Sequence, residues 1–215
     1  MGQYYHPTMI DENGNITWVY THHYSDGLKL MEHSYIGNST MNAVCGQIRN
    51  HPLRIAWIGD YSDEQYGDAY ESKIPREEFM RVFDAVYGSR QQDHLVHPSP
   101  MAHDTDSTGW YLVNHTQKCA LHLDSYILLN KWTESWKNPR TGEEEKWDMC
   151  IHPLSLLTAC GNDRGGGDYH SGYPGYDRVG TWAFDLIELT ENKPEGYRET
   201  MYTFTEQYKN ECCSI

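Results

Sequence analysis

The chain lacks any clustered positive charge. Lys and Arg number 17 among 215 residues, against 31 Asp and Glu, which gives a formal net charge of −14. The acids are spread along the chain, for example at Asp60 and at Glu143-Glu144-Glu145, rather than gathered in a tail. Binding to a nucleic-acid backbone relies on grouped cations that release counterions. The composition therefore argues against direct nucleic-acid binding, and it is compatible with solubility or with mimicry of a nucleic acid.

Membrane, export and disulfide signals are also missing. The sequence has no transmembrane segment, and its first residues lack both the basic and the apolar part of a signal peptide. The six cysteines include no CxxC pair, and the adjacent Cys212 and Cys213 are badly placed to bridge each other. We therefore expect a cytoplasmic protein with no membrane partner and no disulfide framework.

Motifs for catalysis and for cofactor binding are missing as well. There is no Walker A loop, dinucleotide fingerprint, GxSxG elbow or HExxH helix. The histidine-rich candidates for metal binding lack zinc-specific spacing; they are His22-His23, His94 with His97, His103-Asp104-Thr105-Asp106, and Cys119 with His122. We expect no metal and no cofactor, and we assign no catalytic residue. A binding protein is favoured over an enzyme.

Tyr and Trp are abundant, with 17 and 7 copies against 4 Phe, and they suit half-buried strands, pockets and interfaces. In the first half, β-rich segments at 3–10 and 16–22 flank an Asn13-Gly14 turn, which predicts a β-hairpin. Helical spacing and helix signals then predict helices near residues 28–35, over 40–48 and from Pro75 to Gly88, with a short strand at 54–58.

The second half repeats parts of this pattern. The predicted elements are a hairpin at 110–114 and 119–123, a Trp-rich insertion at 132–147 turning at 138–142, an apolar helix at 153–160, a Gly-rich loop at 163–180, a strand at 181–189 and a last strand or helix near 201–208. These elements predict the α+β class, with mixed or antiparallel sheets flanked by helices.

An aperiodic linker at 89–108 separates a first half, 1–88, from a second half, 109–215, and the two are compatible with one compact unit. The matching segments are Gly2-Gln3-Tyr4 with Gly109-Trp110-Tyr111, Ala43-Val44-Cys45-Gly46 with Thr158-Ala159-Cys160-Gly161, and the Trp57 to Asp60 spacing with Trp182 to Asp185. We interpret them as an internal duplication of a β-β-α-β unit, with chance similarity as the alternative. Both tryptophans should then be buried, on equivalent strands.

The most unusual stretch runs from Asp163 to His170. Three consecutive glycines let backbone N–H groups converge on one point, and Arg164 adds positive charge. We predict a site for a small anionic ligand, formed by Arg164, Gly165, Gly166, Gly167, Asp168, Tyr169 and His170. The alternative is a tight structural loop in which Asp168 caps a turn and Arg164 pairs with an acid.

Four segments carry a resemblance to a family of uncharacterised bacterial and phage proteins; they are Met1-Gly2-Gln3-Tyr4-Tyr5, Asp26-Gly27-Leu28-Lys29-Leu30-Met31-Glu32, Gly161-Asn162-Asp163-Arg164-Gly165-Gly166-Gly167-Asp168 and Val179-Gly180-Thr181-Trp182. Members of that family begin with MGQYY and carry GDGLKL and GNGRGGGD signatures, which these four segments resemble. The resemblance implies a cytoplasmic α+β protein, in the host cytoplasm if phage-encoded, and no particular activity. Asp163 replaces the usual Gly, and Phe184-Asp185-Leu186 replaces the usual Gly-Asp-Arg, which weakens the case for a basic anion site.

Three functions fit these features. The first is a non-enzymatic protein that binds a nucleotide-like ligand, with aromatic rings on the base and loop amides on the phosphates; in a phage it would sequester a host immune signal as an anti-defence protein. The second is an acidic inhibitor that mimics nucleic acid and blocks a partner with a basic groove, such as a CRISPR effector. The third is a hydrolase using Asp168 and His170. A homo-oligomer is compatible with each.

Overall fold

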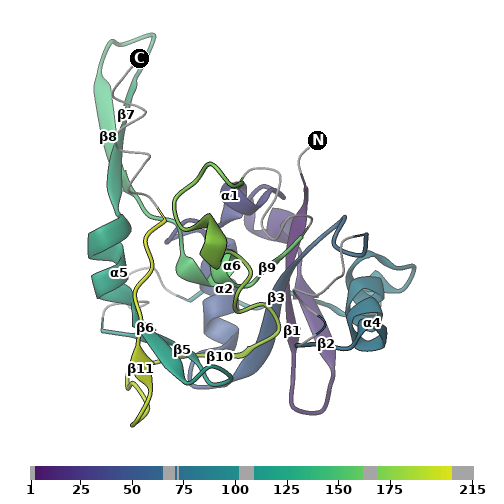
Figure 1. Cartoon of the computed structure of the whole chain (residues 1–215). Helices are drawn as coiled ribbons and strands as arrows, with labels where there is room; N and C mark the ends of the chain where they lie inside the picture. Colours follow the sequence, from purple (N-terminus) through teal and green to yellow (C-terminus); the bar gives the residue numbers. More distant parts are fainter. Residues whose placement is uncertain (1–2, 65–70, 72, 102–108, 162–168, 205–215) are drawn as a thin grey trace.

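The protein has an α+β fold, as the sequence predicts. The computed structural model describes residues 3–64, 71, 73–101, 109–161 and 169–204. Helices pack on a large mixed sheet, and a second, two-stranded sheet projects from it (Figure 1). Among the described residues, no helix combines the length and the apolar character needed to cross a lipid bilayer.

The elements follow in chain order. The strands of the main sheet are β1 (Tyr5–Ile10), β2 (Ile16–Val19), β3 (Leu53–Gly59), β4 (Leu95–Val96), β5 (Tyr111–Asn114), β6 (Cys119–His122), β9 (Ala159–Cys160), β10 (Leu186–Thr190) and β11 (Arg198–Glu199). The small sheet consists of β7 (Trp132–Lys137) and β8 (Glu144–Met149). The helices are α1 (Leu30–His33), α2 (Ser39–Gln47), α4 (Arg76–Tyr87), α5 (Leu123–Asn130) and α6 (Pro153–Leu157), with 3-10 turns η1 (Thr21–Tyr24), η2 (Gln91–Asp93) and η4 (Tyr176–Arg178).

The pattern of parallel and antiparallel strand pairs in the main sheet is the same when read from either edge toward the centre. The strand order runs β11-β6-β5-β10-β3-β1-β2-β4, with β9 beside β3. Each side of the sheet contains a hairpin, β1–β2 on one side and β5–β6 on the other. An inner strand, β3 or β10, runs antiparallel to the first strand of the hairpin, and an outer strand, β4 or β11, runs parallel to the second. The inner strands β3 and β10 meet at the centre, where Leu186 lies opposite Arg54 and Ile187 opposite Leu53. Both halves of the chain therefore build one sheet; their common ancestry stays a prediction.

Two cores cover the two faces of this sheet. Successive residues of β3 point to opposite faces, so Ile55 and Trp57 join one core and Ala56 and Ile58 the other. The larger core includes apolar residues of α1, α2, α5 and α6, whereas α4 supplies the smaller one through its periodic face (Figure 1). The linker range 89–108 contains η2 and β4, and β4 pairs with β2.

Several predicted elements differ in the structure. The strand predicted at 181–189 begins only at Leu186, because residues 181–184 form a turn in which Phe184 has a φ of +64°. The helix predicted at 153–160 ends at Leu157, and Ala159–Cys160 pair with β3 instead. Near the C-terminal end, 201–204 form no helix or strand, and 205–208 lie outside the described residues.

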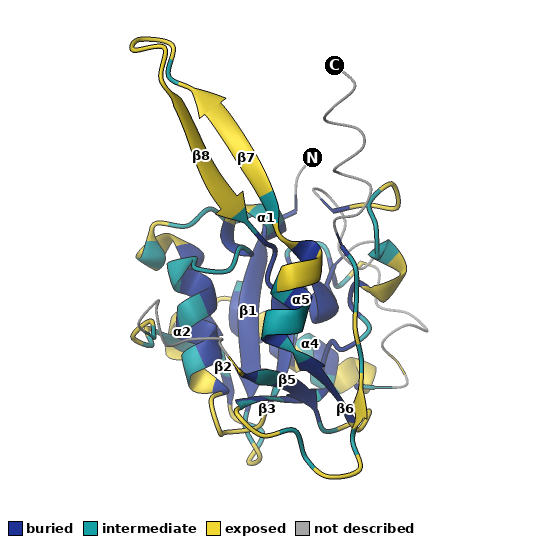
Figure 2. Ribbon diagram, turned by 90° about the vertical axis from the view of Figure 1, so that its left-hand side faces the viewer, coloured by how far each residue is buried: buried dark blue, intermediate teal, exposed yellow. Residues whose placement is uncertain are grey.

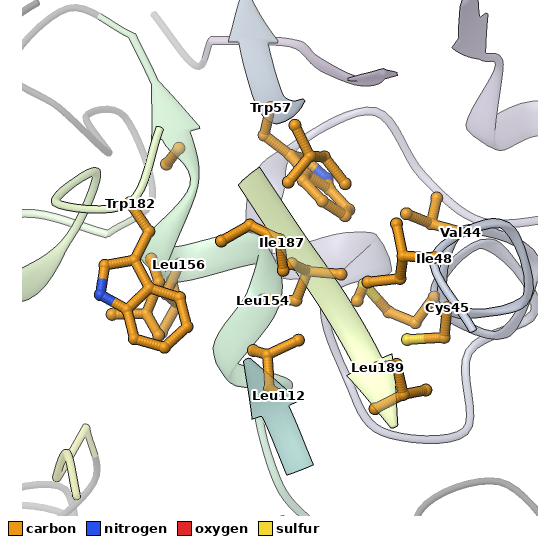
Figure 3. Packing of buried hydrophobic residues seen from close by; sticks show 14 of the residues in the cluster. Val44, Cys45, Ile48, Trp57, Leu112, Leu154, Leu156, Trp182, Ile187 and Leu189 are labelled. Atoms are coloured by element: carbon orange, nitrogen blue, oxygen red, sulfur yellow. The ribbon is translucent and has the colours of Figure 1, made fainter. Parts of the chain in front are cut away.

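These differences correct the predicted match between Trp57 and Trp182. Trp57 lies in β3, but Trp182 lies in the turn before β10, so the two residues are not equivalent. Their predicted burial is confirmed, since neither side chain is exposed to solvent. Figure 3 shows Trp57 in the core that contains Val44 and Ile48, and Trp182 next to Leu156.

The buried indole of Trp57 is also a hydrogen-bond donor. Its Nε1–H donates to Nε2 of His33 at 3.0 Å, while Nδ1–H of His33 donates to the carbonyl oxygen of Gly27 at 3.0 Å. We expect Trp57→Phe to lower the free energy of unfolding by about 1–3 kcal/mol, because it leaves a buried imidazole nitrogen without a donor. Urea unfolding measures this. Trp136→Phe, at an exposed position, is the control and should change stability by less than about 0.5 kcal/mol; equal losses would contradict the prediction.

Candidate functional site

The β7–β8 hairpin stands away from the rest of the molecule. Its strands pair with each other, and the structure places no other described strand beside them. Every residue at 133–137 and 144–148 is exposed, as the yellow ribbon in Figure 2 shows. Such a hairpin contributes little to the core of the protein, so its sequence is free to serve another purpose.

Local interactions shape both ends of the hairpin. At the tip, the side-chain oxygen of Asn138 accepts from the N–H of Arg140 at 2.9 Å, and Gly142 adopts a φ of +76°. At the base, Ile36 N–H donates to the carbonyl oxygen of Cys150 at 2.8 Å. Lys131 and Asp148 form an ion pair at 2.6 Å, which lowers the pKa of the Asp148 carboxyl. The hairpin is therefore fixed to the body at its base.

One face of the hairpin carries all of its tryptophans. Glu134 lies opposite Trp147, and Trp136 lies opposite Glu145. Because side chains alternate along a strand, these four residues share one face with Trp132 and Met149, and we call this set the Trp face. The opposite face is polar; it consists of Thr133, Ser135, Lys137, Glu144, Lys146 and Asp148.

The Trp face leaves a large apolar area in water. Trp136 is 46% exposed and Trp147 is 42% exposed, and at the end of α5 next to the hairpin Leu128 is 85% exposed. The register makes Trp136 and Trp147 diagonal neighbours, a position from which a pair adds little to the stability of a hairpin. An exposed group of large apolar side chains is nevertheless typical of an interaction surface, and Trp is the residue most often found at the energetic centre of one.

The predicted anion site lies mostly outside the described residues. Arg164, Gly165, Gly166, Gly167 and Asp168 fall there, and with them the predicted Asp168–His170 pair of the hydrolase alternative. Tyr169 is buried, and its hydroxyl donates to the carbonyl oxygen of Phe204 at 3.2 Å. His170 is exposed and meets the ring of Tyr173 at 4.6 Å, edge to face.

A cysteine–histidine pair lies in the core. Nε2 of His152 is 3.5 Å from Sγ of Cys45, and Nδ1 accepts from the N–H of Leu154 at 3.1 Å. Burial lowers the pKa of His152 to about 3, so the imidazole is neutral at pH 7. A reactive thiolate needs a cationic neighbour, which this ring does not supply. The contact therefore holds α2 against α6 rather than activating the thiol.

Metal-binding groups do not converge in the described part of the chain: no three His, Cys, Asp or Glu side chains are placed to hold an ion. Of the histidines singled out in the sequence, His23 and His97 have ring centroids 4.2 Å apart. His122 caps α5 by accepting from the N–H of Ser125.

The alternation of residues in the two strands is a sequence signal for the Trp face. Trp132, Glu134 and Trp136 alternate with polar residues, as do Glu145 and Trp147, which is the period of a strand with one apolar face. The sequence predicts the insertion and its turn but no site there, because alternation alone does not show whether another layer covers the apolar face.

No family model, no curated protein and no solved structure matches this chain. The resemblance to the bacterial and phage family therefore stays a prediction.

Three buried histidines make the stability of the fold sensitive to acid. Burial lowers the pKa of His6 and of His152 to about 3 and that of His33 to about 4, from an ordinary 6.5. Below pH 6.5 the unfolded chain takes up protons that the folded chain does not. Above pH 6.5 all three are neutral in both states and their burial carries no protonation penalty; as the pH falls toward 4, we expect each to lower the free energy of unfolding by up to roughly 1.4 kcal/mol per pH unit.

Urea unfolding between pH 7 and 4 measures this loss. The comparison variant is His33→Gln, whose side-chain oxygen replaces the acceptor for Trp57 but does not titrate. The free energy of unfolding of this variant should fall less steeply as the pH is lowered. The difference in slope should be up to about 1.4 kcal/mol per pH unit, which corresponds to one proton. Identical slopes for the variant and the natural protein would show that His33 is not held neutral by the fold.

Proposed function

We propose that this protein binds other proteins through the Trp face, and that its partner presents Lys and Arg side chains. One observation carries the proposal: Trp136 and Trp147 are about half exposed and lie beside Glu134 and Glu145 on the outer part of the Trp face, beyond Trp132, which packs against Tyr35 and the core. The hairpin extends this face away from the body, so a partner can approach it without obstruction from the sheet (Figure 2).

The chemistry of the Trp face selects for cations. Tryptophan is the best aromatic ring for binding an ammonium or guanidinium group over its face. The neighbouring carboxylates of Glu134 and Glu145 add charge-assisted hydrogen bonds to the same cations. The basic residues of the strands, Lys137 and Lys146, lie on the opposite face. A net charge of −14 further steers a basic partner toward the protein.

A second copy of the chain is a poorer occupant. Two Trp faces brought together would place the carboxylates of Glu134 and Glu145 near their own copies, and like charges at an interface oppose association. An inhibitor that occupies the basic groove of a nucleic-acid-binding protein, such as a CRISPR effector, is one form of the proposal, and it accounts for the dispersed acidity of the whole chain.

A peptide-display selection against the purified protein tests this proposal without a known partner. We expect the enriched peptides to be rich in Arg and Lys and to bind Trp136→Ala/Trp147→Ala at least roughly tenfold more weakly, because Trp is a frequent hot-spot residue. The matched control, Ser135→Ala, lies on the opposite face and should bind as the natural protein does. Enrichment of acidic peptides, or equal binding by the Trp variant, would contradict the proposal; self-association lost in that variant would indicate a second copy instead.

A nucleotide-like ligand at the Gly-rich loop is the second candidate function. The observation that favours it is an aromatic stack within the loop, just after its glycines: Tyr173 stacks on Tyr169 at 5.0 Å with 20° between the rings, and His170 packs on Tyr173. Because Tyr169 is buried, this stack is fixed in place. His170 is the exposed ring of this stack, and an exposed ring held in place by its neighbours is suited to stacking on a base.

Thermal unfolding with a panel of nucleotides, cyclic dinucleotides and ADP-ribose derivatives tests this candidate. A ligand at a hundredfold excess over its dissociation constant should stabilise the protein by roughly 2.7 kcal/mol. Gly166→Val should abolish the stabilisation, whereas Ser135→Ala, at an exposed position of the β7–β8 hairpin, should retain it. A panel without any effect on the natural protein would rule the candidate out.

A further inference from the structure

A cavity opens at the junction between β3 and β10. Its volume is about 470 Å³, and its walls include Arg54, Lys73, Glu78, Thr116 and Asp185. Two cations and two anions thus face one small space beside α4. The Trp face has no part in this cavity, so the site is independent of the proposed protein-binding function.

The Lys73–Asp185 pair forms a closed network. Asp185 is 2% exposed, and its carboxylate accepts from Nδ2 of Asn114 at 2.8 Å, Nε2 of Gln117 at 2.7 Å and Nζ of Lys73 at 3.2 Å. Lys73 also donates to the carbonyl oxygens of Thr181 and Ala183. A buried charge is stable when it is paired and fully hydrogen-bonded, and this network therefore makes a rigid wall.

The Arg54–Glu78 pair is different. Nη1 of Arg54 donates to Oε1 of Glu78 at 2.8 Å, and each side chain is 29% exposed. A guanidinium group has five N–H donors; within the described part of the chain Arg54 uses Nη1 for this bond and Nε for a bond of 3.2 Å to the carbonyl oxygen of Phe184. Oε2 of Glu78 accepts no hydrogen bond from a described residue. Both groups can therefore bind further partners.

Backbone strain holds one side of the cavity. Phe184 adopts a φ of +64°, a left-handed conformation that is strained for a bulky residue. This conformation brings the Phe184 N–H to the carbonyl oxygen of Ile55 at 2.8 Å and its own carbonyl to Arg54. The strained turn thus orients the guanidinium group that faces the cavity.

We propose that this cavity binds a small zwitterion that carries a carboxylate and an ammonium group, the chemistry of a free α-amino acid. The walls are neutral overall, so a ligand with one net charge would leave a charge in the cavity unbalanced. A dipolar ligand pairs with both sides: its carboxylate takes the remaining N–H groups of Arg54, which suit a planar anion, and its ammonium group takes Glu78. The Thr116 oxygen accepts a hydrogen bond from the N–H of Leu186 at 2.9 Å, so its O–H group can donate a further hydrogen bond to the ligand carboxylate.

Calorimetric titration with the twenty standard amino acids tests this proposal. We expect at least one to bind at least roughly tenfold more tightly than both its decarboxylated and its deaminated analogue. Glu78→Gln should weaken that binding at least tenfold, whereas Glu77→Gln, exposed on the same helix, should leave it unchanged. Thr116→Val should weaken it too, and it serves as the readout should Glu78→Gln fail to fold.

Two results would overturn the proposal. One is the absence of binding by every amino acid at concentrations of roughly 10 mM, where even a millimolar dissociation constant gives a signal. The other is equal binding of an amino acid and its singly charged analogues. Trp136→Ala/Trp147→Ala should bind the amino acid as the natural protein does, so failure of the protein-binding proposal and failure of this one are distinguishable.

Discussion

The pairing of β3 with β10 is the contact on which the rest of the fold depends, because it joins two halves of the chain into one sheet. It consists of two residue pairs, Leu186 with Arg54 and Ile187 with Leu53. Asp185 extends this short contact: its carboxylate binds Asn114 at the end of β5, Gln117 in the following turn, and Lys73 before α4. A buried carboxylate is costly unless all its partners are present, so these segments must assemble together.

The same junction sets the two faces of the molecule. Alternate side chains of β3 enter the two cores. One core contains Trp57, whose indole binds His33, and the other is formed with α4. Four of the cysteines are buried as free thiols, and His33 and His152 make specific hydrogen bonds in the core. Polar groups in the core therefore fix the positions of neighbouring helices, which apolar packing alone leaves less defined.

Sequence patterns within a single segment predicted the helices and strands that are stabilised mainly by interactions within that segment. The β1–β2 hairpin follows from Asn13-Gly14, where Gly14 has a φ of +78°, and α4 from its acidic start and apolar face. The turn before β10 could not be found this way, because Phe184 takes its αL conformation from bonds to Arg54 and Ile55, 130 residues away. The same limit applies to the sites. Alternation predicts a two-faced hairpin, but whether its apolar face is covered depends on the whole fold.

The body and the hairpin differ in what their aromatic residues do. In the body, Trp57, Trp182 and Tyr126 are fully buried, and their size contributes directly to the free energy of folding. In the hairpin, Trp136 and Trp147 keep 46% and 42% of their surface exposed, so they gain less from folding. Polar residues at those positions would make an equally good exposed hairpin and a more soluble protein. The two tryptophans are thus better explained by a contact outside the chain than by the stability of the chain itself.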